Sequence, residues 1–390
     1  MQTVADAGSG SRALATCTVR GSINHDEYFH VAHIVRPGET LSSTFHESRV
    51  GGKGANQAVA VALAAGGGES SGSNPAKVKF YGTIGHDGAW IRERMREVGV
   101  GVEGILVSET ELTGRAIIQV DERGENSIIL FPGANYSTLH EDAFRAQSLT
   151  TAGTGGYFPH STHLLLQNEI PLEATLSAIH SAKVSSQPPR QSQLGGQRDT
   201  IVIINPSPLP ARDTISAFPW EKVDWLIVNE DEARELFEAF GGGVGRGGGD
   251  GKVEAARELV HALGGMEAFR NTSVVCTLGA KGVLARQCGV EKGMEIVYVP
   301  AAKLRGGVPK DTTGAGDCFA GYFVCELMGM ADAHDDSADK EGTDFKLTQM
   351  ELEKLLKVAV QAAGMCCEKS GTIDSYPTRR EVEERMKDGV

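Results

Sequence analysis

The chain has 390 residues, of which 40% are hydrophobic and 23% charged, and its formal net charge at pH 7 is −13. This composition is that of a globular protein with a large core. The acidic balance argues against nucleic acid or an anionic membrane as a partner, because either would need a surplus of Lys and Arg. A small-molecule partner fits the charge better.

The cysteines and the N-terminal segment indicate the compartment. The seven cysteines have no CxxC spacing, and several lie in apolar runs, so they are expected to be reduced core residues. Residues 1–12 contain no apolar signal region, and no apolar run reaches the roughly 18 residues that a membrane span requires. We expect a cytoplasmic protein, with the nucleus as a further location.

Short apolar runs rich in β-branched residues recur along the chain and predict strands that are buried on both faces, as in a parallel sheet. The runs cover residues 14–23, 78–84, 163–167, 201–204, 225–228 and 273–278. Helical patterns separate several of them and cover residues 55–65, 90–98, 230–240, 253–263 and 315–327. The alternation predicts an α/β fold in which helices cover both faces of a sheet.

Two stretches, 25–50 and 114–131, instead alternate apolar and polar residues, and 121–125 reads as a tight turn. This pattern predicts hairpins exposed on one side. A lid over a binding cleft, formed mainly by 24–50 and 112–132, is one interpretation. A hairpin that only extends the main sheet is the other.

Four polar segments have too little apolar surface to pack and are expected to be loop insertions. They lie near residues 66–76, 184–200, 241–252 and 331–345. Without them the chain approaches the usual size of one domain, so the sequence favours a single domain over 1–390 with a lid.

Polar residues follow several of the predicted strands. In open α/β sheets ligands bind beyond the carboxyl ends of the strands, although any single such residue could be only a cap or a turn. The residues concerned are Ser22 to Asp26, Asn168 with Glu169, Asn205, Asn229 with Glu232, and Thr277 with Gly279.

The segment from Gly51 to Gln57 reads Gly-Gly-Lys-Gly-Ala-Asn-Gln and directly precedes an Ala-rich helix. Glycines there would let a polar ligand touch backbone N–H groups at the helix N-terminus. The amide of Asn56 and the carboxylate of Asp26 could bind adjacent hydroxyls of a monosaccharide. A plain glycine-rich turn is the alternative.

The segment from Asp311 to Asp317 reads Asp-Thr-Thr-Gly-Ala-Gly-Asp and leads into an apolar helix. Small residues ahead of a helix can form an anion hole for a transferring phosphoryl group. Asp317 would then be close enough to remove a proton from an attacking hydroxyl. Alternatively, Asp317 only caps the helix.

Together, Gly-Ser-Ile-Asn-His-Asp at 21–26, the 51–57 run and the 311–317 run resemble the two signatures of the phosphofructokinase-B family of carbohydrate kinases, in its ribokinase branch. The resemblance extends from about Ser22 to Pro377. It implies a three-layer α/β/α sandwich with a small β-sheet lid, and a homodimer formed through that lid.

The resemblance also implies roles for individual residues. Asp317 would be the catalytic base, beside an anion hole of Gly314, Ala315 and Gly316. The sugar would be held by Asn24, His25, Asp26, Gly52, Lys53, Gly54, Ala55, Asn56 and Glu169. ATP would be bound by Asn229, Thr277, Leu278, Gly279, Ala280, Lys281 and Gly282, together with Gly316 and Asp317.

Two metal ions are implied as well. Glu232 would reach Mg²⁺ through water. An activating monovalent cation, usually K⁺, would be held mostly by backbone carbonyls of Asp311, Thr313, Cys366, Lys369, Gly371 and Ser375.

The implied reaction is transfer of the terminal phosphate of ATP to the O-5 hydroxyl of D-ribose, giving ribose 5-phosphate and ADP. Two alternatives remain open. One is a kinase of the same family for another sugar or a nucleoside, since hydroxyl-binding residues are shared among such enzymes. The other is a catalytically silent regulator that binds a sugar.

Overall fold

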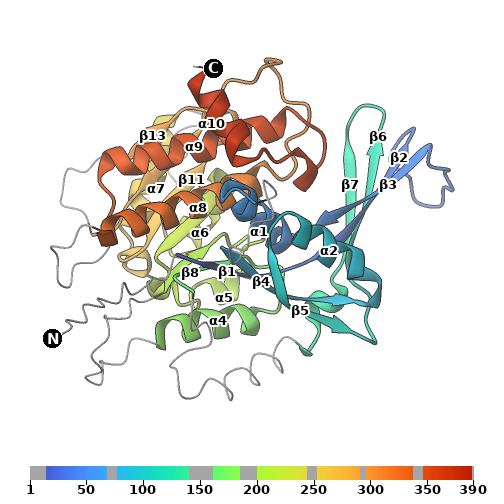
Figure 1. The fold of residues 1–390 in the computed structure, drawn as a ribbon, viewed down its shortest axis with the longest axis horizontal. Coiled ribbons are helices and arrows are strands. Elements are labelled where there is room, and N and C mark those ends of the chain that lie inside the picture. Colours follow the sequence, from blue (N-terminus) through green and yellow to red (C-terminus); the bar gives the residue numbers. More distant parts are fainter. Residues whose placement is uncertain are drawn as a thin grey trace, which may run out of the picture.

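The computed structural model describes residues 15–67, 77–139, 161–184, 200–243, 253–289, 296–336 and 346–388. A large α/β body carries a smaller sheet that projects from one side, at the right of Figure 1. No helix of these residues has the length and apolar character needed to span a membrane.

The body is built on a sheet of nine strands in the order β13-β12-β11-β10-β9-β8-β1-β4-β5. Pairing is parallel from β5 to β11, whereas β12 and β13 extend the sheet through antiparallel pairs. The strands are β1 (Cys17–Arg20), β4 (Val78–Gly85), β5 (Gly101–Ser108), β8 (His163–Leu166), β9 (Ile201–Ile204), β10 (Trp225–Asn229), β11 (Ser273–Thr277), β12 (Val283–Arg286) and β13 (Val297–Val299).

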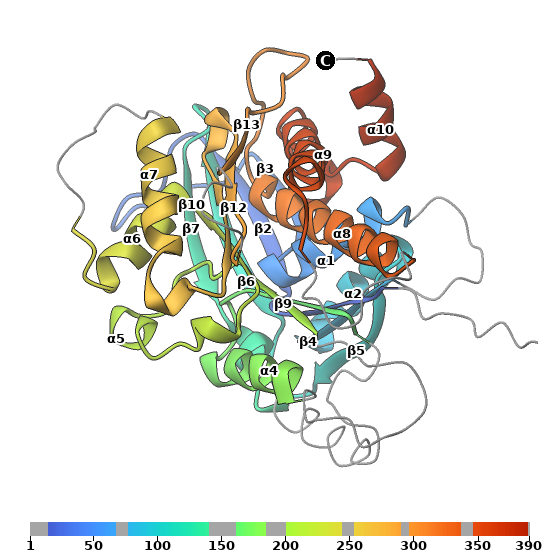
Figure 2. The ribbon, with the colours of Figure 1, turned by 90° about the vertical axis from the view of Figure 1, so that its left-hand side faces the viewer.

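Helices cover both faces of this sheet, as Figure 2 shows. Alternation along β8 illustrates why: Leu165 packs into the core on one face, and Leu164 and Leu166 pack into the core on the other. One layer contains α1 (Lys53–Ala64), α2 (Ala89–Glu97), α8 (Ala315–Asp336), α9 (Gln349–Cys367) and α10 (Arg379–Lys387). The other contains α4 (Leu172–Val184), α5 (Arg212–Ile215), α6 (Glu230–Ala239) and α7 (Val253–Gly264). The expected three-layer sandwich is confirmed.

The second sheet has the order β3-β2-β6-β7 and joins two hairpins through the parallel pair β2 and β6. We call these four strands the small sheet. They are β2 (Asn24–Val31), β3 (Phe45–Gly51), β6 (Gly114–Asp121) and β7 (Asn126–Phe131). The strands coincide with the two stretches whose alternation predicted hairpins, except that β2 begins one residue before the first stretch and β3 ends one residue after it.

Two boundaries expected from the sequence are wrong. The apolar run 14–23 does not form one strand, because β1 ends at Arg20 and Asn24 already belongs to the small sheet. Helix α8 continues to Asp336, into a segment expected to be a polar loop from 331 onward. The remainder of that loop, and most of the other three polar segments, lie outside the described residues.

Candidate active site

Asp317 lies in the first turn of α8 and is 7% exposed. Its Oδ2 accepts a hydrogen bond from Asn56 Nδ2 at 3.0 Å, and its Oδ1 accepts one from Gln57 Nε2 at 2.9 Å. The N-terminal ends of α1 and α8 therefore meet at this carboxylate. The helices can approach closely because Gly321 has no side chain: a Cβ there would lie 2.3 Å from the Cβ of Ala60.

The glycines before and in the first turn of α1 are required by close packing. Gly52 precedes the helix with φ of 85°, which favours glycine. A Cβ on Gly54 would lie 2.6 Å from the backbone nitrogen of Ser22. The buried Ala55 donates its N–H to the Ser22 carbonyl at 2.9 Å. This turn is thus fixed against the chain segment that connects β1 to β2.

Glu169 follows β8 and anchors the same turn. Its Oε2 accepts hydrogen bonds from Ser22 Oγ at 2.6 Å and from the Lys53 backbone N–H at 2.9 Å. The carboxylate therefore satisfies a free N–H at the start of α1, where negative charge is favourable. Its negative charge also acts on Asp26, across the site.

Asp26 projects from β2 and is 9% exposed. Burial, together with the charges of Glu169 and Asp317, raises the pKa of Asp26 to about 7. Asp26 Oδ1 and Asn56 Oδ1 are both buried without a hydrogen-bond partner among the described residues. Unpaired buried oxygens are costly, so these two atoms indicate a place for a polar ligand that donates hydroxyl hydrogens.

Asn24 and His25 take different positions. Asn24 Oδ1 accepts from Asn135 Nδ2 at 2.7 Å, and Asn135 also bonds the backbone of Ile23, so Asn24 is held beside the site. Side chains alternate along β2, which places His25 on the face opposite Asp26. The ring of His25 instead packs edge-on against Trp90, with centroids 5.2 Å apart, and burial lowers its pKa. The structure does not bring His25 together with the other expected sugar-binding residues.

The expected anion hole is a glycine turn at the start of α8. Gly314 has φ of 75°, and a Cβ there would lie 2.5 Å from Thr372 Cγ2. A Cβ on Gly316 would meet nothing within 4 Å, so the backbone next to Asp317 borders open space. Free N–H groups at a helix N-terminus favour an anion in that space.

The residues expected to bind nucleotide lie at the carboxyl edge of β10 and β11, where Asn229 pairs in register with Thr277. Asn229 and Glu232 form a capping box at the start of α6, with bonds of 2.8 and 2.9 Å between each side chain and the other's backbone N–H. The following loop contains Leu278, Gly279, Ala280, Lys281 and Gly282. Within it, Gly279 and Gly282 have φ of 56° and 100°, and a Cβ on Gly279 would meet no atom.

The segments expected to hold a monovalent cation also lie side by side. The carboxylate of Asp311 accepts N–H bonds from Thr313 and Gly371, each at 2.9 Å, and these bonds lower the pKa of Asp311 although burial opposes them. The thiol of Cys366 lies 3.0 Å from Ser375 Oγ. Lys369 contributes its backbone to this loop, while its ammonium group faces Glu381 at 3.7 Å.

Lys53 lies between the two sides of the site. The charge of Asp317, opposed by burial and assisted by Glu169 and Glu232, raises the pKa of Lys53. Since Glu232 lies on the expected nucleotide side and Glu169 on the expected sugar side, the Lys53 ammonium group is influenced by carboxylates of both sides.

Sequence reasoning missed three side chains that the site contains: Gln57, Gln167 and Asn135. Gln57 belongs to the glycine-rich run, but its partner Asp317 lies 260 positions away along the chain, so no local pattern reveals the contact. Asn135, in a short turn after β7, similarly bonds to Ile23 and Asn24 across more than 100 positions. The only available signal was that Gln57 directly follows Asn56.

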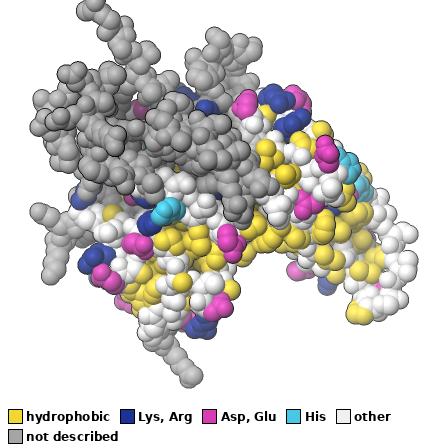
Figure 3. Space-filling view, turned by 90° about the horizontal axis from the view of Figure 1, so that it is seen from below, with side chains coloured by type: hydrophobic (Ala, Val, Ile, Leu, Met, Phe, Trp, Pro, Cys, Tyr) yellow, Lys and Arg dark blue, Asp and Glu magenta, His cyan; other side chains and the backbone are white. Residues whose placement is uncertain are grey.

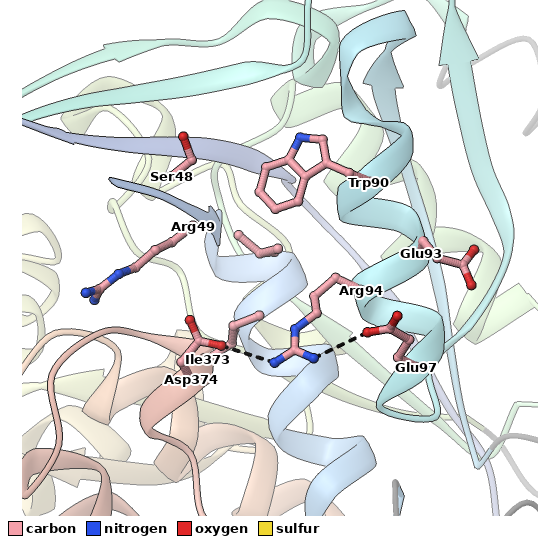
Figure 4. Close-up of a pocket in the computed structure, with 9 residues that line it drawn as sticks. Ser48, Arg49, Trp90, Glu93, Arg94, Glu97, Ile373 and Asp374 are labelled. Carbon is pink, nitrogen blue, oxygen red and sulfur yellow. Dashed lines mark hydrogen bonds and ion pairs between the residues drawn. The ribbon is translucent and has the colours of Figure 1, made fainter. Parts of the chain in front are cut away.

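A pocket of about 470 Å³ lies outside this site, between β3, α2 and the turn Ile373–Ser375 (Figure 4). Trp90 and Arg94 line it, and the guanidinium of Arg94 bonds Asp374 at 3.2 Å and Glu97 at 3.3 Å. The charged groups therefore largely satisfy one another, and the pocket lies beside the contact between His25 of the small sheet and Trp90 of α2.

These features define a class of protein. A carboxylate beside an open glycine turn at a helix N-terminus, opposite unpaired oxygens suited to hydroxyls, is an arrangement for phosphoryl transfer to an alcohol. Comparison with known proteins agrees, since the model of the pfkB family of carbohydrate kinases matches residues 16–379. The chain therefore belongs to the pfkB family, and it is an ATP-dependent carbohydrate kinase.

Relatives make the assignment narrower. The chain is 32% identical over 374 residues to a ribokinase of Haemophilus influenzae, covering 95% of this chain and 98% of that protein. It is 29% identical over 376 residues to a ribokinase of Schizosaccharomyces pombe, covering 94% and 96%. Among solved structures, a ribokinase of Cryptococcus neoformans in complex with ADP is similar with a TM-score of 0.73 and 40% identity, covering 95% and 99%. The protein is thus a sugar kinase similar to ribokinases.

Proposed function

We propose that this protein is a ribokinase, which transfers the terminal phosphate of ATP to the O-5 hydroxyl of D-ribose and releases ribose 5-phosphate and ADP. The observation that carries the proposal is the buried carboxylate of Asp317, bonded by Asn56 and Gln57 beside the open Gly316 backbone. The ribokinases to which the chain is similar support ribose as the sugar.

In the proposed reaction Asp317 is the base. The primary hydroxyl of the sugar lies between Asp317 and the phosphate of ATP, and Asp317 accepts its proton as the oxygen attacks in line. The backbone N–H groups of Gly314, Ala315 and Gly316 then stabilise the charge of the transferring group, with Ala315 leaving its 3.3 Å bond to the Thr312 carbonyl. Lys53 adds a positive charge between sugar and nucleotide. Most of the rate enhancement comes from this positioning and neutralisation.

The remaining hydroxyls of the sugar bind to Asp26 and Asn56, whose unpaired buried oxygens need donors. Gly51 leaves room for the Asp26 carboxylate, because a Cβ there would lie 2.1 Å from it. Asn24, Glu169 and the backbone of Gly52 to Ala55 complete this side. His25 supports the strand from behind, through its contact with Trp90.

ATP would lie along the carboxyl edge of β10 and β11, over the loop from Thr277 to Gly282. Mg²⁺, bound with ATP, would neutralise phosphate charge. The Glu232 carboxylate accepts the Asn229 N–H through Oε2, and in the resemblance it reaches the ion through water. The described residues contain no cluster of three His, Cys, Asp or Glu side chains that could hold a metal alone, which fits an ion held largely by phosphate.

A monovalent cation, K⁺ in the resemblance, would bind the loop formed by Asp311, Thr313 and the segment from Cys366 to Ser375. The fit rests on a carboxylate kept ionised by two N–H bonds and on a left-handed turn at Gly371, with φ of 97°. Such a loop presents backbone carbonyls, which hard cations prefer. When bound, the ion would supply charge next to the turn that begins α8.

The chain would form one kinase domain, with the small sheet as its lid and as the contact of a homodimer. Strand β7 exposes Ile128, Ile129, Leu130 and Phe131, which are between 48% and 64% exposed. Figure 3 shows hydrophobic side chains on the side of the molecule where this sheet lies. Apolar groups on both faces of a protruding edge strand favour a second copy of the chain as cover.

The test is release of ADP by the purified protein with ribose, deoxyribose, fructose and adenosine as separate acceptors. We expect ribose to give the highest kcat/KM, with phosphate on O-5 of the product. A preference for fructose or adenosine would mean that the protein is a kinase of the same family for that acceptor and not for ribose. Binding of ribose without any ADP release would indicate a silent regulator.

A further inference from the structure

Gln57 is fully buried and forms three hydrogen bonds at the centre of the site. Its Nε2 donates to Asp317 Oδ1 at 2.9 Å and to Asn205 Oδ1 at 3.0 Å. Its Oε1 accepts from Nε2 of Gln167, a second fully buried glutamine, at 2.6 Å. We call Gln57, Asn205 and Gln167 the amide relay.

The direction of the Gln57 amide matters, because its two ends have similar shapes but opposite chemistry. A reversed amide would place Oε1 against the Asp317 carboxylate and would repel it. Two contacts prevent the reversal. The Ile227 carbonyl can only accept, so it binds Asn205 Nδ2 at 2.9 Å and leaves Asn205 Oδ1 facing Gln57. Gln167 presents its Nε2 donor to the other end of the Gln57 amide, while its own Oε1 is buried without a hydrogen-bond partner among the described residues.

The relay is tightly enclosed by the strand ends. Gln167 immediately follows β8, and Asn205 immediately follows β9, so both lie at the carboxyl edge of the main sheet. A Cβ on Gly21 would lie 2.1 Å from Gln167 Oε1. The packing therefore leaves Gln167 little room to turn away from Gln57.

We propose that the amide relay is a positioning device for the catalytic carboxylate: Asn205 and Gln167 fix the direction of Gln57, and Gln57 holds Asp317 Oδ1. The proposal rests on the proposed role of Asp317 as base. With Oδ1 held by Gln57 and Oδ2 by Asn56, the carboxylate is kept in one orientation. Each oxygen retains a lone pair that can accept a proton from a hydroxyl.

The relay is tested with Gln57→Met and Gln167→Met, which keep the length of the side chain and remove the amide. Gln57→Met should lower kcat roughly tenfold to a hundredfold, the effect of losing one hydrogen bond to a charged group. Gln167→Met, which removes a donor to Gln57 and no bond to Asp317, should lower kcat roughly threefold to tenfold. In both variants the KM for ribose should stay within about twofold, because the change acts on the base.

The dependence of kcat on pH separates positioning from a general loss of structure. With one donor fewer, the ionised carboxylate is less favoured, so the acid limb of the profile should move to higher pH. The matched control is Gln361→Met in α9, since Gln361 is 7% exposed and its Nε2 has no hydrogen-bond partner among the described residues. This control should keep wild-type kcat and the wild-type profile.

Distinct outcomes separate this proposal from the proposed function. If Asp317→Asn is inactive while Gln57→Met and Gln167→Met keep normal kcat and pH profiles, the relay is overturned and the base stands. If Asp317→Asn turns over ribose normally, the base itself is wrong. A fall in kcat with an unmoved acid limb and a raised KM would also overturn the relay. If Gln57→Met does not fold, Gln57→Glu keeps the shape, and its acid limb should move further upward because two carboxyls then compete.

Discussion

Asp26 shows the conflict between binding and stability at the scale of one residue. Its carboxyl group is buried near two other acidic groups, Glu169 and Asp317, and Oδ1 has no partner in the described part of the chain. A buried acceptor without a donor destabilises the ligand-free protein. The same atom gains a hydrogen bond when a sugar hydroxyl arrives. Residues that bind ligand are commonly those that cost stability in its absence.

This conflict predicts how stability depends on pH. The pKa of Asp26 rises from 3.8 to about 7 on folding, so between these values the folded chain binds a proton that the unfolded chain lacks. Stability from this group therefore falls as pH rises through that window and is constant above it. Asp26→Asn leaves no charge to bury at this position, so it should raise the free energy of unfolding by roughly 2–4 kcal/mol at pH 8. Thermal unfolding should show a gain in Tm that is larger at pH 8 than at pH 5, with weaker ribose binding. An equal gain at both values would contradict the raised pKa.

At the scale of elements, the site exists because the N-terminal ends of α1 and α8 meet beneath the small sheet. Two close contacts depend on glycine. Gly54 lets α1 pack against the backbone of Ser22, and Gly321 lets α8 pack against Ala60 of α1. Small residues let two helix N-termini, each with free N–H groups, face one ligand space. The same backbone that binds ligand thus also sets the packing distance.

A pair of glycine variants tests this packing. Gly54→Ala places a Cβ 2.6 Å from the backbone nitrogen of Ser22, so it should destabilise the fold by about 1–3 kcal/mol and weaken sugar binding. Gly329→Ala in the exposed part of α8 meets no atom within 4 Å and should stabilise by about 1 kcal/mol. Denaturant unfolding measures both. Equal effects of the two substitutions would mean that the turn before α1 is not closely packed.

Patterns within one element were readable from the sequence, whereas contacts between elements were not. β9 occupies the predicted residues 201–204, because a short continuous run of β-branched residues is typical of a strand buried on both faces of a parallel sheet. The antiparallel strands β12 and β13 went unpredicted, since their short sequences include arginine and tyrosine rather than an unbroken aliphatic run. The resemblance implied that His25 and Asp26 both hold the sugar, whereas neighbours in a strand face opposite ways and His25 packs against Trp90. The amide relay needed three distant segments to be placed together.

At the scale of the whole molecule, the exposed apolar residues of the small sheet bear on whether the protein is a monomer or a dimer. Ile129 and Leu130 point to opposite faces of β7, and they are 59% and 64% exposed. A single chain leaves both faces of this strand open to water. A second copy packed on the small sheet would cover Ile129 and Leu130 and stiffen the small sheet.

We therefore expect the wild-type protein to be a dimer at micromolar concentration in light scattering. The double variant Ile129→Glu with Leu130→Glu should run at half that mass, because buried unpaired carboxylates oppose the contact. Val308→Glu is the matched control, since Val308 is 74% exposed and lies outside the small sheet. The control should remain dimeric. A monomeric wild-type protein would remove the dimer from the account.

The most direct measurement of the central claim is the steady-state rate of Asp317→Asn with ribose and ATP, together with ribose binding by calorimetry. Asparagine keeps the shape of the side chain, but its single oxygen can accept from only one of the two donors, Asn56 Nδ2 and Gln57 Nε2, and it cannot accept the hydroxyl proton. The account predicts a fall in kcat of about a thousandfold with ribose affinity within a few-fold of wild type. Near-normal turnover in this variant would contradict the assignment of Asp317 as the base.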